Sequence, residues 1–139
     1  MNRSTLLISL TMVLAFVPAS WAVMSWAQPL EGTKWKVKVV PEEDAVKAGI
    51  EPFDDLLTFK GGKFNTDSSK KRGIAAADFE EDSRRGPIAT FSAELKDSKG
   101  GKSKWTGTVT GSEISGQMEW SSKEGGTITY TFKGEKVQQ

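Results

Sequence analysis

The sequence contains no cysteine and no histidine among its 139 residues. Without these two residue types there is no Ser–His or Cys–His catalytic pair, no zinc site built on thiolate or imidazole, and no histidine to ligate haem. The absence of cysteine also excludes disulfides, on which many small secreted domains rely. Packing alone must therefore hold the fold, and the catalysis that remains open is carboxylate chemistry.

Two acidic clusters, Asp54-Asp55 and Glu80-Glu81-Asp82, are the candidates for that chemistry. A glycosidase needs two carboxylates about 5 to 9.5 Å apart across a cleft, whereas neighbours on a strand point to opposite faces. No spacing typical of a calcium-binding EF-hand loop supports a metal site either. We interpret both clusters as exposed strand ends and loops, and we expect no enzyme activity, no cofactor and no metal.

Charge is nearly absent from the N-terminal segment, where Arg3 is the only charged residue before Glu31. An apolar run over residues 6–17 and then small residues follow Arg3, which is typical of a secretory signal peptide. The run is short for a bilayer span, which needs about 20 apolar residues; an uncleaved anchor is the alternative. We therefore expect residues 1–27 to be cleaved, which leaves a single domain over residues 28–139. The mature protein would be periplasmic or secreted.

The predicted mature chain has no net charge. Removing residues 1–27 lowers Lys plus Arg from 19 to 18, which equals the 18 Asp plus Glu. A neutral surface exerts no long-range attraction on DNA, RNA or anionic lipid, and we interpret the basic cluster Lys70-Lys71-Arg72 as solvated loop charge. We therefore expect no nucleic-acid partner, no membrane span after signal removal, and a monomer by default.

The clearest pattern is the alternating segment KWTGTVTGSEISGQMEW, residues 104–120. A two-residue turn at Gly111-Ser112 is typical of a β-hairpin, and it places Trp105 opposite Met118. In this register all apolar residues share one face, and a slip by one residue would scramble both faces. The other predicted pairs are Val109–Ile114, Gly107–Gly116, Thr108–Ser115, Thr106–Gln117 and Lys104–Glu119.

The same period of two recurs along the chain, separated by short Gly-rich turns. It predicts an all-β fold of about eight short strands, with one helical turn in PEEDAVKAG, which begins at Pro41. Such strands bury their apolar face in a barrel or between two sheets. Sequential hairpins favour a single antiparallel up-and-down barrel, and a two-sheet β-sandwich is the alternative. The further strand segments are 35–39, 89–95 and 128–132, with a weaker candidate at 74–79. A second hairpin is expected over 57–64, with a turn at Gly61-Gly62 that places Phe64 opposite Phe59.

The segment GTKW, residues 32–35, resembles the start of lipocalin and avidin-type barrels. LTFKGGKF and the hairpin at 104–120 are similar to segments of small exported bacterial lipocalin-like (calycin-type) proteins of unassigned function. The resemblance covers most of the predicted mature chain. It implies a barrel in which Trp35 packs across the closed end.

Aromatic side chains on the predicted inner face point to the function. We expect an exported binding protein that holds a small apolar ligand, with Trp35, Phe91, Trp105 and Tyr130 as the ligand-binding residues. Gly107 opposite Gly116 either leaves a gap for that ligand or marks a bend of the strands. The alternative is a protein-interaction or inhibitor module with a filled barrel, acting through its loops on an unknown protein. The other expected core residues are Val37, Phe59, Phe64, Val109, Ile114, Met118, Trp120 and Phe132.

Overall fold

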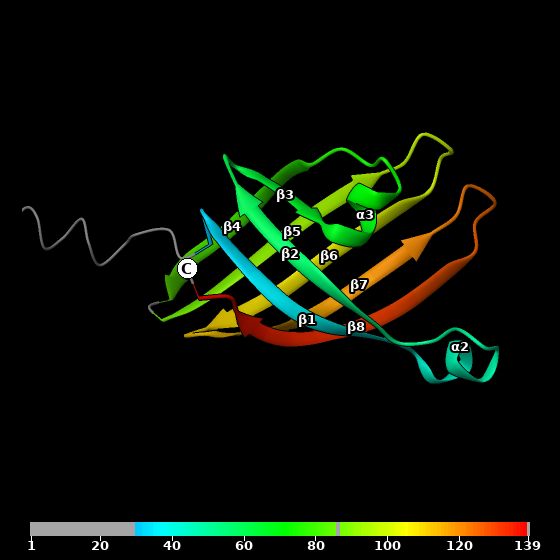
Figure 1. Ribbon diagram of the computed structural model, residues 1–139, viewed down its shortest axis with the longest axis horizontal. Coiled ribbons are helices and arrows are strands. Elements are labelled where there is room, and N and C mark those ends of the chain that lie inside the picture. Colours follow the sequence, from blue (N-terminus) through cyan, green and yellow to red (C-terminus); the bar gives the residue numbers. More distant parts are fainter. Residues whose placement is uncertain (1–29, 86, 139) are drawn as a thin grey trace, which may run out of the picture.

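Eight strands form one closed antiparallel barrel, in the order in which they follow along the chain (Figure 1). The computed structural model describes residues 30–85 and 87–138, so the predicted signal peptide lies outside the described residues. The last strand pairs with the first, which confirms the up-and-down barrel over the sandwich. The strands are β1 (Thr33–Pro41), β2 (Phe53–Lys60), β3 (Lys63–Thr66), β4 (Ala77–Arg85), β5 (Ile88–Lys96), β6 (Lys102–Thr110), β7 (Glu113–Ser121) and β8 (Thr127–Lys136).

The β6–β7 hairpin has the predicted register. Trp105 lies opposite Met118 and Gly107 opposite Gly116, and Gly111 opens the turn with a φ of 63°, which favours glycine. The same alternation is present in the first strand, β1, where every second residue is buried. One face of each strand thus supplies the core, because successive side chains point to opposite faces.

Two short helices interrupt the strands. Helix α2 (Glu43–Lys47) lies within the predicted helical turn and is followed by Gly49 at a φ of 93°. Helix α3 (Asp67–Lys71) was not predicted. It contains two members of the basic cluster and is capped by the third, Arg72, so the interpretation of this cluster as loop charge is wrong.

Strand β4 differs most from expectation. The weak candidate at 74–79 overlaps only its beginning, and the acidic residues 80–82 lie inside the strand rather than in a loop. They pair along β5, with Glu80 opposite Ser92 and Glu81 opposite Phe91. On its other side β4 has only two residue pairs with β3. This seam is the shortest ladder of the barrel.

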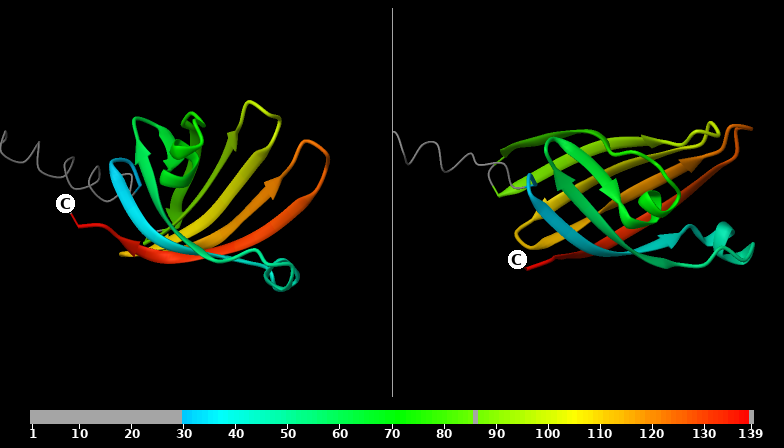
Figure 2. Two further views of the ribbon diagram at one scale, coloured as in Figure 1. Left: turned by 45° about the vertical axis from the view of Figure 1, so that its right-hand side comes forward. Right: turned by 45° about the horizontal axis from the view of Figure 1, so that its top comes forward.

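The connections divide the barrel into two ends. Helices α2 and α3 lie at the same end as the turns that follow β5 and β7, which we call the α3 end (Figure 2). At the opposite end, Leu30 is fully buried and belongs to the core. There the indole N–H of Trp35 donates a 2.8 Å hydrogen bond to the Thr33 hydroxyl, which in turn donates to the carbonyl of Leu30. Leu30 and Trp35 therefore close this Leu30 end.

Candidate functional site

Aromatic rings fill the middle of the barrel. Phe59 lies at the centre of this packing, with ring centroids 5.1 Å from Phe64, 4.9 Å from Phe79 and 5.0 Å from Phe91. These separations are those of favourable edge-to-face and tilted aromatic pairs. The middle of the barrel is consequently a packed core and offers no channel from end to end.

The glycine pair in the β6–β7 hairpin does not leave a gap for a ligand. A Cβ added at Gly107 would lie 2.6 Å from the ring of Phe91 and 3.0 Å from that of Phe132. At Gly116 an added Cβ would lie 2.9 Å from the same Phe132 ring and 2.5 Å from the Cα of Gly107. The two glycines therefore make room for phenylalanine rings and for a close approach of the strands.

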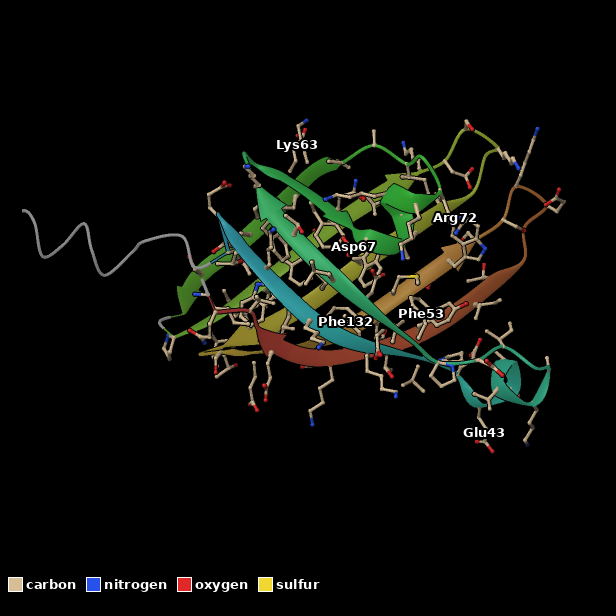
Figure 3. The ribbon with its side chains drawn as sticks, viewed as in Figure 1. Glu43, Phe53, Lys63, Asp67, Arg72 and Phe132 are labelled. Carbon is tan, nitrogen blue, oxygen red and sulfur yellow. The ribbon has the colours of Figure 1, made fainter. Side chains whose placement is uncertain are left out.

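A cavity of about 340 Å³ opens at the α3 end, which we call the mouth cavity. Side chains from four strands meet there under α3 and the segment that follows it. In Figure 3, Arg72 and Phe53 lie toward this end of the barrel, and Phe132 lies nearer its middle. The lining residues are Phe53, Ser68, Ser69, Arg72, Ile74, Ser103, Trp105, Met118, Trp120 and Tyr130.

A buried carboxylate fixes α3 at the mouth. Asp55 on β2 accepts hydrogen bonds from the backbone N–H of Ser68 at 3.0 Å and from its hydroxyl at 2.6 Å. Thr66 caps the helix, because its hydroxyl accepts from the N–H of Ser69. The interpretation of Asp55 as an exposed strand-end residue is thus wrong, since it is buried and it positions the helix.

Arg72 follows α3 and, among the residues that the structure describes, is the only charged one that lines the mouth cavity. Its Cζ lies 4.9 Å from the centre of the Trp120 ring, a cation–π arrangement. Its Nη2 lies 3.7 Å from a carboxylate oxygen of Asp97, in the turn after β5. Among the described residues its guanidinium makes these two contacts and no hydrogen bond.

Tyr130 on β8 lies close to this charge. Partial burial raises the pKa of the Tyr130 hydroxyl above its ordinary value, and the positive charge of Arg72 opposes that shift. The phenol therefore stays protonated at neutral pH and can donate a hydrogen bond. Phe53 packs edge-to-face on the Tyr130 ring, with centroids 6.0 Å apart. The arrangement places a cation and a neutral donor over aromatic walls.

The structure separates the four residues expected to bind ligand. Trp105 and Tyr130 line the mouth cavity, Trp35 lies at the Leu30 end, and Phe91 is buried among the central rings. Of the expected core residues, Trp120 is only partly buried at the cavity wall, and Met118 is buried but lines the cavity. The other six are buried: Val37, Phe59, Phe64, Val109, Ile114 and Phe132.

Sequence reasoning missed Arg72 and Phe53. Arg72 stands in a run of basic residues that has no apolar periodicity, so the sequence pattern does not predict where its side chain points. Its position is set by helix α3, which was not predicted. The available signal was Thr66 followed by polar residues, which is a weak helix start. Phe53 precedes Asp54-Asp55, and this acidic pair masks the alternation at the start of β2.

Other hollows lie on the outer face of the sheet. One of about 500 Å³ runs along β4 and β5 beside the exposed side chains of Glu80 and Asp82, and one of about 700 Å³ crosses β1, β7 and β8 beside Lys38 and Lys133. Both lie between outward-pointing side chains of a continuous sheet. The mouth cavity differs because inward-facing aromatic residues and a helix enclose it.

Glu81, at the Leu30 end of β4, is a partly buried residue whose carboxylate faces inward. Both of its carboxylate oxygens are buried and lack a hydrogen-bond partner among the described residues. Burial raises the pKa of the Glu81 carboxyl, the backbone N–H of Leu30 lowers it, and the charge of Glu31 raises it again. The N–H of Leu30 thus lies near the carboxylate without completing a hydrogen bond of normal geometry.

Within residues 30–85 and 87–138, no three acidic side chains converge in a way that would hold a metal ion. In the same part of the chain, every helix is too short or too polar to cross a membrane. No protein-family model matches the sequence. Comparison with curated proteins gives no significant match, and comparison with solved structures gives none either.

Proposed function

We propose that this protein is an exported, non-enzymatic, lipocalin-like binding protein that holds a small apolar molecule in the mouth cavity. One observation carries the proposal: five large apolar or aromatic side chains line the cavity together with Ile74, three serines and Arg72. The five are Phe53, Trp105, Met118, Trp120 and Tyr130. Small-molecule sites are typically concave and mostly apolar, with a small number of placed polar groups. The mouth cavity is concave and has such apolar walls, with a larger share of polar groups from its three serines and Arg72.

The size of the cavity supports a compact ligand. Its volume of about 340 Å³ is near the lower end of the range of roughly 300 to 1,000 Å³ for small-molecule sites. It also exceeds the engineered apolar cavity of about 150 Å³ that admits benzene. A molecule of one or two rings suits this space.

Two features support the lipocalin-like and exported parts of the proposal. The GTKW segment opens β1, and its Trp35 lies at the Leu30 end, as the resemblance implies. The charge-poor, apolar start of the chain has the pattern of a signal peptide. The lack of cysteine leaves the fold independent of the redox state of its compartment.

Calorimetric titration of residues 28–139 with 1-naphthol, a neutral two-ring probe, tests the proposal. We expect saturable binding to the natural chain. Met118→Trp places a larger side chain in the cavity and should abolish binding, whereas Val40→Trp changes an exposed residue on the outer face and should preserve it. Circular dichroism confirms that each variant is folded.

Native mass spectrometry of protein purified from its own host gives a second measurement, in which we expect a bound small molecule. If no molecule co-purifies and 1-naphthol does not bind, the proposal is wrong. The better account would then be a protein-interaction module that acts through its loops, with the barrel serving as a packed scaffold.

A further inference from the structure

We propose that the natural ligand is a compact aromatic acid whose carboxylate binds Arg72 while its rings lie between Trp105, Trp120 and Tyr130. This inference rests on the proposed function, because it assigns the chemistry of a ligand in the same mouth cavity. It goes further in naming the charge of the ligand, its size and the residue that selects it.

The charge of the cavity favours an anion. Within the described part of the chain, Arg72 is the only charged residue in the wall, and the other polar side chains there are those of three serines and Tyr130. A guanidinium offers five N–H donors in a planar fork that matches a carboxylate. Because the Arg72 guanidinium makes no hydrogen bond among the described residues, its donors remain available to a ligand.

The existing partner of Arg72 holds it only weakly. The 3.7 Å separation from Asp97 is too long for a hydrogen bond, and the Arg72 side chain is 57% exposed, so the ion pair is screened by solvent. Asp97 does not depend on Arg72, because its Oδ1 accepts from the backbone N–H groups of Lys99 and Gly101 at 2.8 and 2.9 Å. A ligand carboxylate can therefore recruit Arg72 without leaving Asp97 unpaired.

Trp120 positions the guanidinium for this contact. The stack on the Trp120 ring places the guanidinium of Arg72 at the cavity wall. Tyr130 lines the same cavity, and its hydroxyl is a second potential donor to a ligand there. A ligand carboxylate can accept hydrogen bonds from both Arg72 and Tyr130. An amide of the same shape has an N–H₂ group in place of one carboxylate oxygen, and this group cannot accept from either donor.

The floor of the cavity limits the length of the ligand. Trp105 lines the cavity from below, and its ring packs on Phe64 at 5.6 Å and on Phe132 at 5.2 Å. These rings belong to the filled middle of the barrel. A long acyl chain therefore has no space to extend into, which favours flat, short molecules over fatty acids.

The test compares 2-naphthoate with 2-naphthamide, which has the same rings and no charge, by calorimetric titration at low salt. We expect the acid to bind at least tenfold more tightly to the natural chain. Arg72→Gln should remove this preference and leave the affinity for the amide nearly unchanged. Lys71→Gln, which removes the neighbouring exposed charge, is the matched control and should keep the preference.

The outcomes separate the two proposals. Equal affinity for acid and amide overturns the inference and leaves the binding function intact, as does an equal loss in Arg72→Gln and Lys71→Gln. Dodecanoate that binds as tightly as 2-naphthoate overturns the size limit. If neither naphthalene compound binds, the proposed function fails together with the inference.

Discussion

Two tryptophans on one face of the same hairpin have different surroundings. Trp105 is 1% exposed, its ring packs on two phenylalanines, and its indole N–H donates to the Ser103 hydroxyl. Trp120 is partly buried at the cavity wall and carries the Arg72 stack. Alternation predicts that both face inward, but it does not reveal how far each lies from the end of the barrel.

The first prediction concerns this difference. Trp105→Ala should lower the free energy of unfolding by about 3–5 kcal/mol, the usual cost of deleting a large buried ring. Trp120→Ala should cost clearly less, because its ring already borders open space. Urea unfolding of both variants measures the losses. Equal losses would mean that the mouth cavity is packed shut in solution.

The second prediction concerns Glu81. The pKa of this carboxyl is raised in the folded protein, so between its unfolded and folded pKa values the folded state binds more protons. Stability therefore falls as pH rises through that window, beginning near the unfolded value of about 4.5, and levels off above the folded pKa. Glu81→Gln lacks this fall, so relative to the natural chain the variant should gain stability from pH 4 to pH 7.

Guanidinium unfolding at the two pH values gives the measurement, and Glu80→Gln is the control because the adjacent side chain points outward and is exposed. The prediction is contradicted if the difference in unfolding free energy between Glu81→Gln and the natural chain is the same at both pH values. The Glu81 carboxylate would then be solvated or paired in solution.

Among the elements, those with strict alternation were predictable. The β6–β7 hairpin carries one apolar face, a glycine turn and a single register that satisfies both faces, so local pattern and barrel geometry agree. Helix α3 and strand β4 escaped prediction for opposite reasons. The helix is one short polar turn held by a tertiary hydrogen bond from Ser68 to Asp55, and β4 carries a buried acid where a strand pattern requires an apolar residue.

The mouth cavity shows the same limit. Its apolar walls follow from alternation along β6, β7 and β8, whereas its charge comes from Arg72 at the end of an unpredicted helix. The position of Arg72 depends on Asp55 and Thr66, which are distant in sequence from the strands β6, β7 and β8. The alternation of apolar and polar residues along a strand carries no information about the hydrogen bonds between Asp55 and Ser68 that fix helix α3.

The third prediction tests the close packing of neighbouring strands. Gly116→Ala should destabilise the protein by about 1–3 kcal/mol or more, because the added methyl group meets the carbonyl of Thr106 and the Cα of Gly107 on the facing strand. Gly126→Ala is the matched control, since its new methyl group would meet only the Ser122 hydroxyl, at 3.4 Å. Similar melting temperatures for the two variants would contradict this account of the hairpin.

At the scale of the whole molecule, we expect the exported protein to begin near Gln28. Arg3, the apolar run and Ser25-Trp26-Ala27 form the pattern that predicts this cleavage. Intact-mass measurement of protein recovered from the exporting cell checks the prediction. A mass that includes residues 1–27 would show that the segment is retained.

The pairing of β8 with β1 also has a consequence for the timing of folding. Every other ladder joins strands that follow one another in sequence, so each can form as a local hairpin. The closing ladder instead joins residues such as Val39 and Phe132, near opposite ends of the described chain. Contacts of such separation are slow to form, and this one requires the last strand to be synthesised. The barrel therefore cannot close before β8 has been synthesised, and closure is expected to limit the folding rate.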